Sequence, residues 1–519
     1  MTYDADLAIA GSGFGGSILA MVAQRLGLRT VLIERGHHPR FAIGESSSPL
    51  AGLLLEELAA RYDLPRLAPL GSFGAWQRSY PDVVCGLKRG FTFYKHEAGC
   101  PYRSTPRRGN QLLVAASPSN ELSDTHWLRA DVDHFLVREA VEQGAALIEG
   151  ATIDAIERRP EGGFGLGVAA GGRHHRVRAR MVVDASGPRG ALARAMGVQE
   201  GSFSAYPGTQ ALYTHFEGVR RCDEMTDYDA PSTRGGAPPY PPDDAALHHV
   251  FDDGWMWVLR FGNGVTSAGV ALTDAAAVTL RIADGESAWQ RLLAQYPTIA
   301  EQFADARPLR PFAWMPHLPY RASTAVGPGW AMLPSAAAFV DPLFSTGFPL
   351  TLLGIERLAG VLERYGTFDG EAAADLAAYE TITLAEADHT ASFISGCYAA
   401  FRRFDVFTAR SMFYFAAASY AEVARRLSAP AVPRQFLCAD DRRFAEATIR
   451  LASGVPSSAS GRRHARAIAC AIAPLNIAGL CKPEKWNWYD VDPADTIRHA
   501  DRLGVTADAA RALFAQMGV

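Results

Sequence analysis

The sequence predicts an α/β fold that opens with a parallel β-α-β unit, continues into a β-rich region and ends in helices. The first observation is a short apolar run, Asp6 to Ala10, followed by the stretch GSGFGG and a helical pattern. The second is the alternation of apolar and polar residues across 206–273, which is typical of antiparallel strands. The third is the alanine-rich helical patterning that dominates from residue 366 onward.

The N-terminal unit has the spacing of a dinucleotide-binding turn. Gly11, Gly13 and Gly16 stand in GxGxxG spacing between the predicted strand and helix. In such a turn the first glycine makes the tight bend, the second lets the backbone approach a pyrophosphate, and the third lets helix and strand pack closely. A second strand, 30–33, ends at Glu34, where an acid accepts from a ribose hydroxyl. This order predicts dinucleotide binding; the alternative is a glycine-rich turn in a nucleotide-free fold.

Composition argues against several classes of protein. The 519 residues carry a formal net charge of -4, which gives no general basic surface for nucleic acid. Seven scattered cysteines without a CxxC pair indicate free thiols in a reducing cytosol and argue against a metal site. The N-terminus lacks signal-type features, and no stretch reaches the roughly 18 apolar residues of a membrane span. We therefore expect a cytoplasmic protein with no metal and no membrane span.

The stretch FVDPLFSTG, 339–347, combines loop-forming and apolar residues at the start of a predicted helix. Because buried backbone N–H groups need partners, the amides of Ser345, Thr346 and Gly347 require an acceptor. Amides at a helix start suit an anion, since the helix dipole is positive there. The alternative is that these amides only cap the helix or contact a cofactor.

Together the motifs resemble those of the flavin-dependent halogenases, which share the FAD monooxygenase-type fold. The resemblance runs from Asp4 to about residue 365, and its motifs stand in family order: GSGFGG with Glu34, IGES (43–46), WLRADVD (127–133), DASGPRGALA (184–193) and FVDPLFSTG. The three most specific are FxxPxxSxG at Phe339, Pro342, Ser345 and Gly347, WxW at Trp255 and Trp257, and KxGxxF at Lys88, Gly90 and Phe93. The missing acidic residue at Phe344 makes the chain similar to the phenol or pyrrole type within this family.

The resemblance implies a Rossmann-like FAD-binding domain, a β-rich substrate region inserted into it and a helical C-terminal region. The expected FAD-binding segments are 1–45, 105–200 and 322–365. The β-rich substrate and tunnel region is expected at 46–104 and 201–321, and the helical substrate-covering region at 366–519. The Pro- and Gly-rich loop 227–244 is expected to act as a lid.

The resemblance also implies a two-component mechanism. In the family, reduced FAD from a separate flavin reductase reacts with oxygen, and chloride or bromide held by backbone amides becomes hypohalous acid. The acid passes through a tunnel to a lysine, which directs halogenation of an electron-rich ring. By position, the cofactor-binding residues are Gly11, Gly13, Phe14, Gly16, Glu34, Arg35, Glu45, Ser46, Arg129, Asp184, Ser335, Asp341 and Pro342. The halide-binding residues are Ser345, Thr346 and Gly347, and the tunnel or substrate residues are Trp255, Trp257, Arg260, Phe93 and Phe344.

Lys88 is the predicted catalytic residue. It lies in the apolar and glycine-rich strand VVCGLKRGFTFY, where alternation places it on the face opposite to Leu87. A buried lysine is costly unless paired, and its pKa falls readily. By position alone an exposed strand lysine is the simpler interpretation, and KxGxxF is what favours catalysis. Lys95 is the weaker candidate.

Two departures from the family pattern bear on function. Leu259 and Arg260 replace the usual Ile-Pro after WxW, so Arg260 could pair with a carboxylate, contact substrate or face solvent. Pro334 and Ser335 replace the usual Gly-Asp whose carboxylate meets the ribityl chain; a serine hydroxyl can still hydrogen-bond there but has no charge.

The leading prediction is a two-component FAD-dependent halogenase acting on an aromatic or pyrrolic substrate, free or tethered to a carrier protein. The departures keep a second hypothesis open: a hydroxylase, dehydrogenase or geranylgeranyl-reductase-like flavin enzyme on the same scaffold. A third is a degenerate flavin-binding protein without catalysis. Halide dependence separates the first hypothesis from the second.

Overall fold

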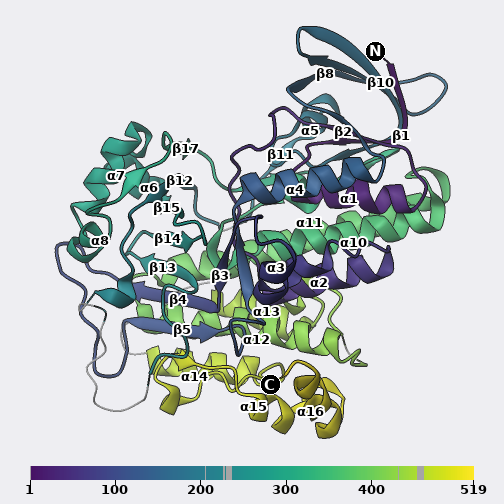
Figure 1. The fold of residues 1–519 in the computed structure, drawn as a ribbon. Coiled ribbons are helices and arrows are strands. Elements are labelled where there is room, and N and C mark those ends of the chain that lie inside the picture. The colour runs from purple at the N-terminus through teal and green to yellow at the C-terminus, as the bar shows by residue number, and fades with distance from the viewer. Residues whose placement is uncertain are drawn as a thin grey trace.

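Two large β-sheets flank a central group of helices in the computed structural model (Figure 1). The structure describes residues 2–204, 206–225, 228, 237–430, 432–452 and 461–518. In the view of Figure 1 the N-terminal strand lies at the top and the C-terminal helices lie at the bottom. Half of the expected lid over 227–244, residues 227 and 229–236, lies outside the described residues.

The first sheet is built on the N-terminal β-α-β unit. Its strand order is β19 (Val326–Gly327), β20 (Trp330–Met332), β10 (Arg173–Asp184), β1 (Thr2–Ala10), β2 (Thr30–Ile33) and β7 (Ala146–Ile148), and β8 (Ala151–Arg158) and β9 (Phe164–Ala170) extend it. β1 pairs in parallel with β10 and β2, and β2 pairs in parallel with β7. Strands from three distant parts of the chain thus form one nucleotide-type sheet.

Helix α1 (Phe14–Arg25) follows β1 and packs closely on the sheet. A Cβ placed on Gly16 would lie 2.0 Å from the carbonyl oxygen of Gly11, so only glycine permits this approach. Gly11 itself has a φ of 95°, a conformation that favours glycine. The predicted Rossmann-like opening is confirmed. On its outer side α1 packs against α4 (Arg129–Glu142) and α10 (Gly347–Tyr365).

The second sheet holds the predicted antiparallel strands. Its order is β16 (Arg307–Pro308), β12 (Thr209–Glu217), β15 (Thr266–Thr273), β14 (Gly254–Arg260), β13 (Ala246–Val250), β4 (Gly90–Lys95), β5 (Gln111–Ala115) and β22 (Trp488–Tyr489), with β17 (Ala313–Met315) beside β12. β12, β15, β14 and β13 pair antiparallel in turn. β5 pairs with β4 in this sheet, although the expected boundary at residue 105 assigned it to the FAD-binding domain.

Short elements connect the strands of the two sheets. They are β3 (Cys85–Lys88), β6 (Asp124–Trp127), β11 (Glu200–Gly201), β18 (Tyr320–Ala322), β21 (Ala338–Phe339), α3 (Phe73–Ser79), α5 (Ala191–Ala195), α6 (Asp274–Leu280), α7 (Glu286–Leu293), α8 (Pro297–Gln302) and α9 (Pro334–Ala337). β3 and β6 form a separate two-stranded ribbon. This ribbon lies near the centre of the molecule in Figure 1.

The C-terminal region is helical, as its composition indicates. It comprises α11 (Ala373–Ala400), α12 (Phe404–Arg426), α13 (Arg442–Ala452), α14 (Gly461–Ile472), α15 (Pro493–Arg498) and α16 (Ala507–Gln516). α11 packs on α10, and α12 packs on α2 (Pro49–Arg61), so these helices bury the centre of the molecule. None of the helices in the described segments has the length and apolarity needed to cross a bilayer.

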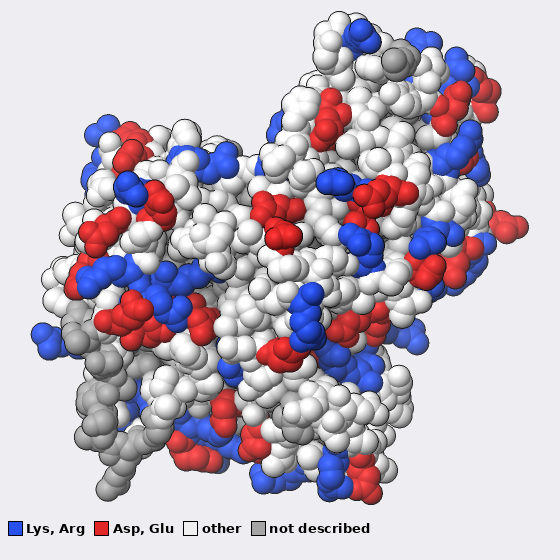
Figure 2. Space-filling view, in the orientation of Figure 1, with Lys and Arg blue, Asp and Glu red and all other residues white. Residues whose placement is uncertain are grey.

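Charged side chains of both signs are interspersed on the face shown in Figure 2. Among the described residues on that face no broad basic patch is present, in keeping with the net charge of -4. This face therefore offers no extended electrostatic footprint for nucleic acid.

Candidate active site

Lys88 ends strand β3 and is completely buried, with 0% of its surface exposed. Its Nζ donates to the carbonyl oxygen of Ser47 and lies 3.4 Å from Ser345 Oγ. The same nitrogen sits 4.2 Å from the ring centroid of Phe91, a cation–π distance. The exposed strand lysine of the simpler interpretation is thus excluded. The ammonium is held where the two-stranded ribbon meets the FVDPLFSTG segment.

That segment forms a strained turn before α10. Phe344 and Ser345 have φ values of 66° and 56°, a left-handed conformation that costs a non-glycine residue roughly 1–3 kcal/mol. Packing offsets this cost, because the Phe344 ring lies within 6 Å of the rings of Phe93 and Tyr414, at 5.6 and 4.9 Å. Strain retained in this way is typical of functional turns.

The turn leaves the first amides of α10 available. The Ser345 amide donates to the Pro342 carbonyl oxygen, and Ser345 Oγ donates to Ser46 Oγ. Helix α10 starts at Gly347, with neither a side-chain nor a backbone acceptor for the Thr346 and Gly347 amides in the described part of the chain. A Cβ at Gly347 would meet no atom within 4 Å, so open space adjoins these amides. An anion fits there, since helix N-termini attract negative charge.

Asp341 anchors the turn from inside. Its Oδ2 accepts from the hydroxyls of Tyr206 and Tyr398, and its Oδ1 accepts from the Leu343 amide. Burial raises the pKa of Asp341 to about 6, against the lowering effect of these donors. The carboxylate is satisfied by the protein itself, so Asp341 shapes the turn. Its expected contact with the cofactor stays a prediction.

Aromatic side chains pack around Phe91, the ring that Lys88 contacts, and along strand β14 of the same sheet. Trp255 and Trp257 lie on one face of β14, with ring centroids 5.7 Å apart, and both are buried. Phe91 lies 5.7 and 5.6 Å from Tyr414 and Phe415 of α12. The α12 aromatics at positions 414 and 415 therefore pack against the ring that contacts Lys88.

Two guanidinium groups lie beside the glycine-rich turn, and both are ion-paired: Arg129 with Asp133, and Arg40 with Glu34 and Asp133. The guanidinium nitrogens of Arg129 and Arg40 lie 3.3 and 3.4 Å from the position of a Cβ on Gly13. Arg129 forms a two-point ion pair with Asp133, which fixes its orientation. Two guanidinium groups held in place beside this turn could donate to phosphate oxygens, which suits a dinucleotide such as FAD.

Glu34 ends β2, as predicted. Burial alone would raise the pKa of Glu34, but the Gly36 and Ser12 amides and the Arg40 guanidinium outweigh it and lower the pKa to about 2. The carboxylate is ionised at neutral pH. Its Oε1 accepts one hydrogen bond, from Gly36, and so has a second acceptor position for a ribose hydroxyl.

The other predicted cofactor residues line the same side of the first sheet or its edges. Phe14 stacks on Phe348 at 4.6 Å. Asp184 accepts from the Ser186 and Leu192 amides at the end of β10. Arg35 is exposed. These roles in cofactor binding stay predictions.

Glu45 and the departure at Pro334 have clear structural surroundings. Glu45 Oε1 lies 2.7 Å from His215 Nε2, while its buried Oε2 has no hydrogen-bond partner in the described structure.

Pro334 starts α9 and fills the space beside Gly354 of α10, where a Cβ on Gly354 would lie 2.3 Å from the proline ring. Ser335 is half-buried next to it. Pro334 is therefore accommodated by glycine on the facing helix.

Arg260 does not contact the enclosed lysine region. It lies on the face of β14 opposite to Trp255 and Trp257, and its Nε donates to Asp243 at 2.7 Å. Of the three alternatives left open by the sequence, pairing with a carboxylate is the one observed. The expectation that Arg260 contacts substrate has no support here. Lys95 likewise pairs elsewhere, with Asp252 at 2.6 Å.

Sequence reasoning missed two residues of the site, Phe91 and Asp124. Phe91 could have been found from the alternation with Phe93, which places both rings on one face of β4. Asp124 lies opposite Lys88 in the pairing of β3 with β6, a relation without a local sequence signal.

The composition of the whole chain carried a further signal that was missed: the 519 residues contain only four lysines among 51 basic residues, at 88, 95, 482 and 485. A buried lysine in a chain that otherwise uses arginine indicates chemistry specific to an amine.

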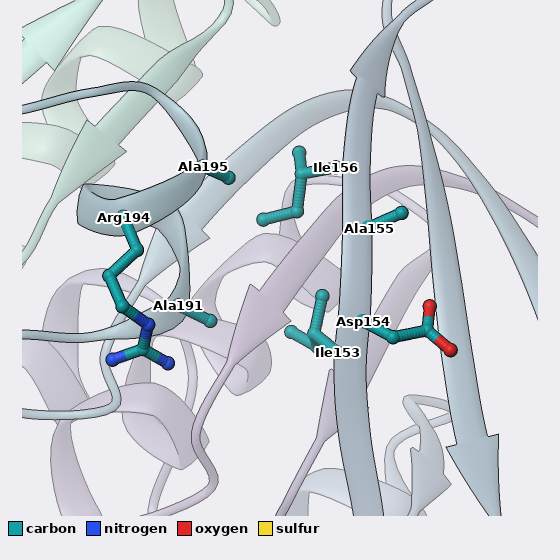
Figure 3. Close-up of a pocket in the computed structure, with 7 residues that line it drawn as sticks. All are labelled: Ile153, Asp154, Ala155, Ile156, Ala191, Arg194 and Ala195. Carbon is teal, nitrogen blue, oxygen red and sulfur yellow. The ribbon is translucent and has the colours of Figure 1, made fainter.

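A separate cavity of about 230 Å³ lies between β8 and α5, away from this site (Figure 3). Its lining consists of Ile153, Asp154, Ala155, Ile156, Ala191, Arg194 and Ala195. In Figure 3 the Asp154 carboxylate points away from α5, so the cavity is walled mainly by small apolar groups. It has no convergent polar groups of the kind that orient a ligand.

Comparison with known proteins gives a consistent family. A family model described as tryptophan halogenase matches residues 125–412. The chain is 30% identical to monodechloroaminopyrrolnitrin halogenase PrnC of Pseudomonas fluorescens, over 78% of this chain and 69% of the relative. It is 31% identical to tetracycline 7-halogenase of Kitasatospora aureofaciens, over 68% of this chain and 62% of that relative. The solved structure of halogenase PltM with phloroglucinol and FAD has the same fold, with a TM-score of 0.71 at 24% identity over 98% of this chain and 94% of that one.

Proposed function

The chain belongs to the tryptophan halogenase family of flavin-dependent enzymes, and we propose that it halogenates an electron-rich ring at Lys88 with a halide held at the start of α10. The observation that carries this proposal is the contact between a fully buried lysine and the strained turn. Lys88 Nζ lies 3.4 Å from Ser345 Oγ, one residue before the free amides of Thr346 and Gly347.

Reduced FAD, when bound, would pass two electrons to oxygen, and the oxygen at the peroxide level would be the oxidant for the halide. The residues that would hold it are Gly11, Gly13 and Gly16 at the turn, with Arg40 and Arg129 beside the phosphates and Glu34 at the ribose. The open space at Gly347 faces the N-terminal end of α10, where both a flavin ring and an anion would meet backbone amides.

Chloride or bromide would bind to the amides of Thr346 and Gly347. The Ser345 amide is already used within the turn, so Ser345 contributes its backbone conformation and its hydroxyl instead. The left-handed conformation of Phe344 and Ser345 aims the following amides into the open space. Amide dipoles that the fold holds in place need no reorganisation to bind an anion.

Lys88 would act on the hypohalous acid. Its ammonium donates a proton to the oxygen of the acid while the halogen–oxygen electron pair moves to that oxygen, releasing water. The ring carbon forms the new bond to the halogen, and the ring then loses one proton, which restores the ammonium. The sum is arene plus hypohalous acid giving haloarene plus water.

The substrate would be an electron-rich aromatic or pyrrolic compound. The names of the two relatives near 30% identity point to a pyrrolnitrin-type compound and a tetracycline, respectively. Phe91 contacts Lys88 and Tyr414 packs against Phe91, so the aromatic side chains beside the lysine suit a flat ring. The substrate is either free or tethered to a carrier protein. Measuring the halogenation rates of an aromatic or pyrrolic carboxylic acid, free and attached to a carrier protein, decides between the two.

A separate flavin reductase would supply reduced FAD. Within the described residues the first sheet is the single parallel nucleotide-type sheet, which leaves no second fold of that kind for NAD(P)H. The test is an assay with chemically reduced FAD, oxygen, bromide and a simple phenol. A brominated product that requires both the protein and bromide supports the proposal, whereas a hydroxylated product formed equally without bromide would identify the chain as a hydroxylase.

A further inference from the structure

Three titratable side chains share one face of the β3–β6 ribbon. Lys88 lies directly opposite Asp124, and Gly86 lies directly opposite His126 in the same antiparallel register. Residues that are opposite, or two apart on one strand, project to the same face. All three side chains are buried, with 0% exposure for Lys88 and His126 and 5% for Asp124.

The Asp124 carboxylate is short of partners. Its buried Oδ2 has no hydrogen bond in the described structure. A buried ionised carboxylate without partners is costly, so such groups are retained where they serve a function. The nearest strand to this carboxylate carries the one lysine of the active site.

The other charged groups around this face are already paired or neutral. On α12, Arg426 pairs with Glu422 and Glu56. Tyr414 of the same helix is a neutral phenol, because burial raises its pKa. His126 on β6 and His248 on β13 are neutral too, because burial lowers the pKa of each to about 3, with Lys88 adding to this effect. Lys88 is left as the natural counter-charge for Asp124.

We propose that Asp124 is a positioning residue that keeps Lys88 in its ammonium form inside the buried site. The inference rests on the proposed function, since that function needs Lys88 as a proton donor. A lysine buried alone loses its proton near pH 5–6, which would leave a neutral amine at neutral pH. A carboxylate across the ribbon opposes that loss.

The electrostatics agree with the geometry. Burial lowers the pKa of Lys88 to about 8, and the Asp124 carboxylate opposes this shift. Burial raises the pKa of Asp124 to about 7, and the Lys88 ammonium opposes that shift. Each group therefore stabilises the charged form of the other, and removing the carboxylate leaves only the desolvation that favours the neutral amine.

The scarcity of lysine makes the test direct. Protein labelled with ¹³C at lysine Cε gives signals from only four residues, and the Lys88→Arg variant identifies the signal of Lys88. The pH titration is recorded without flavin, halide or substrate. In Asp124→Asn the titration midpoint of Lys88 should fall by about one unit or more.

Asp252→Asn is the matched control, because Asp252 binds Lys95 at 2.6 Å outside the site. It should move the Lys95 signal and leave Lys88 unchanged. An unchanged Lys88 midpoint in Asp124→Asn would overturn the proposal. If Asp124→Asn does not fold, the wild-type midpoint decides: a value near pH 5–6, typical of an isolated buried lysine, would also overturn it.

Activity then separates this inference from the proposed function. With bromide and a phenol, the bromination rate declines as pH rises and the ammonium is lost. This decline should come at a lower pH in Asp124→Asn than in the wild type, while the rate of flavin reoxidation stays the same. Asp124→Glu, which keeps the carboxylate, should restore much of the wild-type profile. If the wild-type protein brominates but Asp124→Asn has the same pH dependence of bromination, the inference fails and the proposed function stands.

Discussion

At the scale of single residues, Lys88 is the group on which the account depends. It is fully buried, contacts Ser345 and Phe91, and is one of only four lysines in the chain. We expect Lys88→Met to reduce halogenated product by at least about 100-fold, the usual scale for losing a positioned proton donor. Flavin reoxidation and peroxide release should continue, because the substitution lies beyond the free amides at the start of α10.

Lys95→Met is the control for this substitution, since Lys95 pairs with Asp252 away from the site. Product formation should be measured by mass spectrometry, and peroxide by a coupled assay. Retained product in Lys88→Met would remove Lys88 from the mechanism. Loss of product in both variants would point to a general effect on folding.

Glu34 gives a prediction about stability and pH. Its folded pKa of about 2 lies below the ordinary value of 4.5, so its ionised form stabilises the fold above pH 4.5, and this contribution is lost as pH falls through 2. We expect Glu34→Gln to lower the melting temperature at pH 7, and the difference from wild type to shrink toward pH 2. Melting curves across this range test it; a difference that does not change with pH would contradict the assignment.

At the scale of elements, the N-terminus of α10 is the feature to probe. Gly347 adjoins open space, so Gly347→Ala should fold normally while its methyl group intrudes beside the amides that face that space. We expect the halide concentration for half-maximal rate to rise at least about tenfold, equivalent to losing one hydrogen bond to a charged group. Steady-state rates over a bromide series measure this.

Gly360 provides the matched substitution in the same helix. A Cβ there also meets no atom within 4 Å, but Gly360 lies far from the first turn. Gly360→Ala should leave halide dependence unchanged and stabilise the helix by about 0.5–1 kcal/mol. Equal halide dependence in the two variants would exclude the α10 amides as the halide site.

At the scale of the whole molecule, local sequence signals predicted the fold class well. The β-α-β opening, the antiparallel strands and the helical C-terminal region each arise from periodicity over short windows. The placement of β5 in the second sheet was not predicted, because it depends on pairing with β4 and with the distant β22. Such pairing is decided by register and burial in three dimensions.

The site divides in the same way. Lys88, Trp255 and the turn at Ser345 could be predicted because each lies in a contiguous motif. Asp124 could not be predicted, because it lies opposite Lys88 only through the pairing of two strands whose partner residues are 36 positions apart in the sequence. The side-chain direction of Arg260 was left open by the sequence, because β14 has buried residues on both faces.

The most direct test of the central claim is the reaction of the reduced FAD complex with oxygen, with and without bromide. The complex is reduced without oxygen and mixed rapidly with oxygenated buffer, and reoxidation is followed by absorbance while a chemical trap collects hypobromous acid. The account predicts a reaction whose course depends on bromide, with trapped hypobromous acid that decreases in Gly347→Ala and not in Gly360→Ala. Reoxidation indifferent to bromide, with all oxidising equivalents released as hydrogen peroxide, would contradict it.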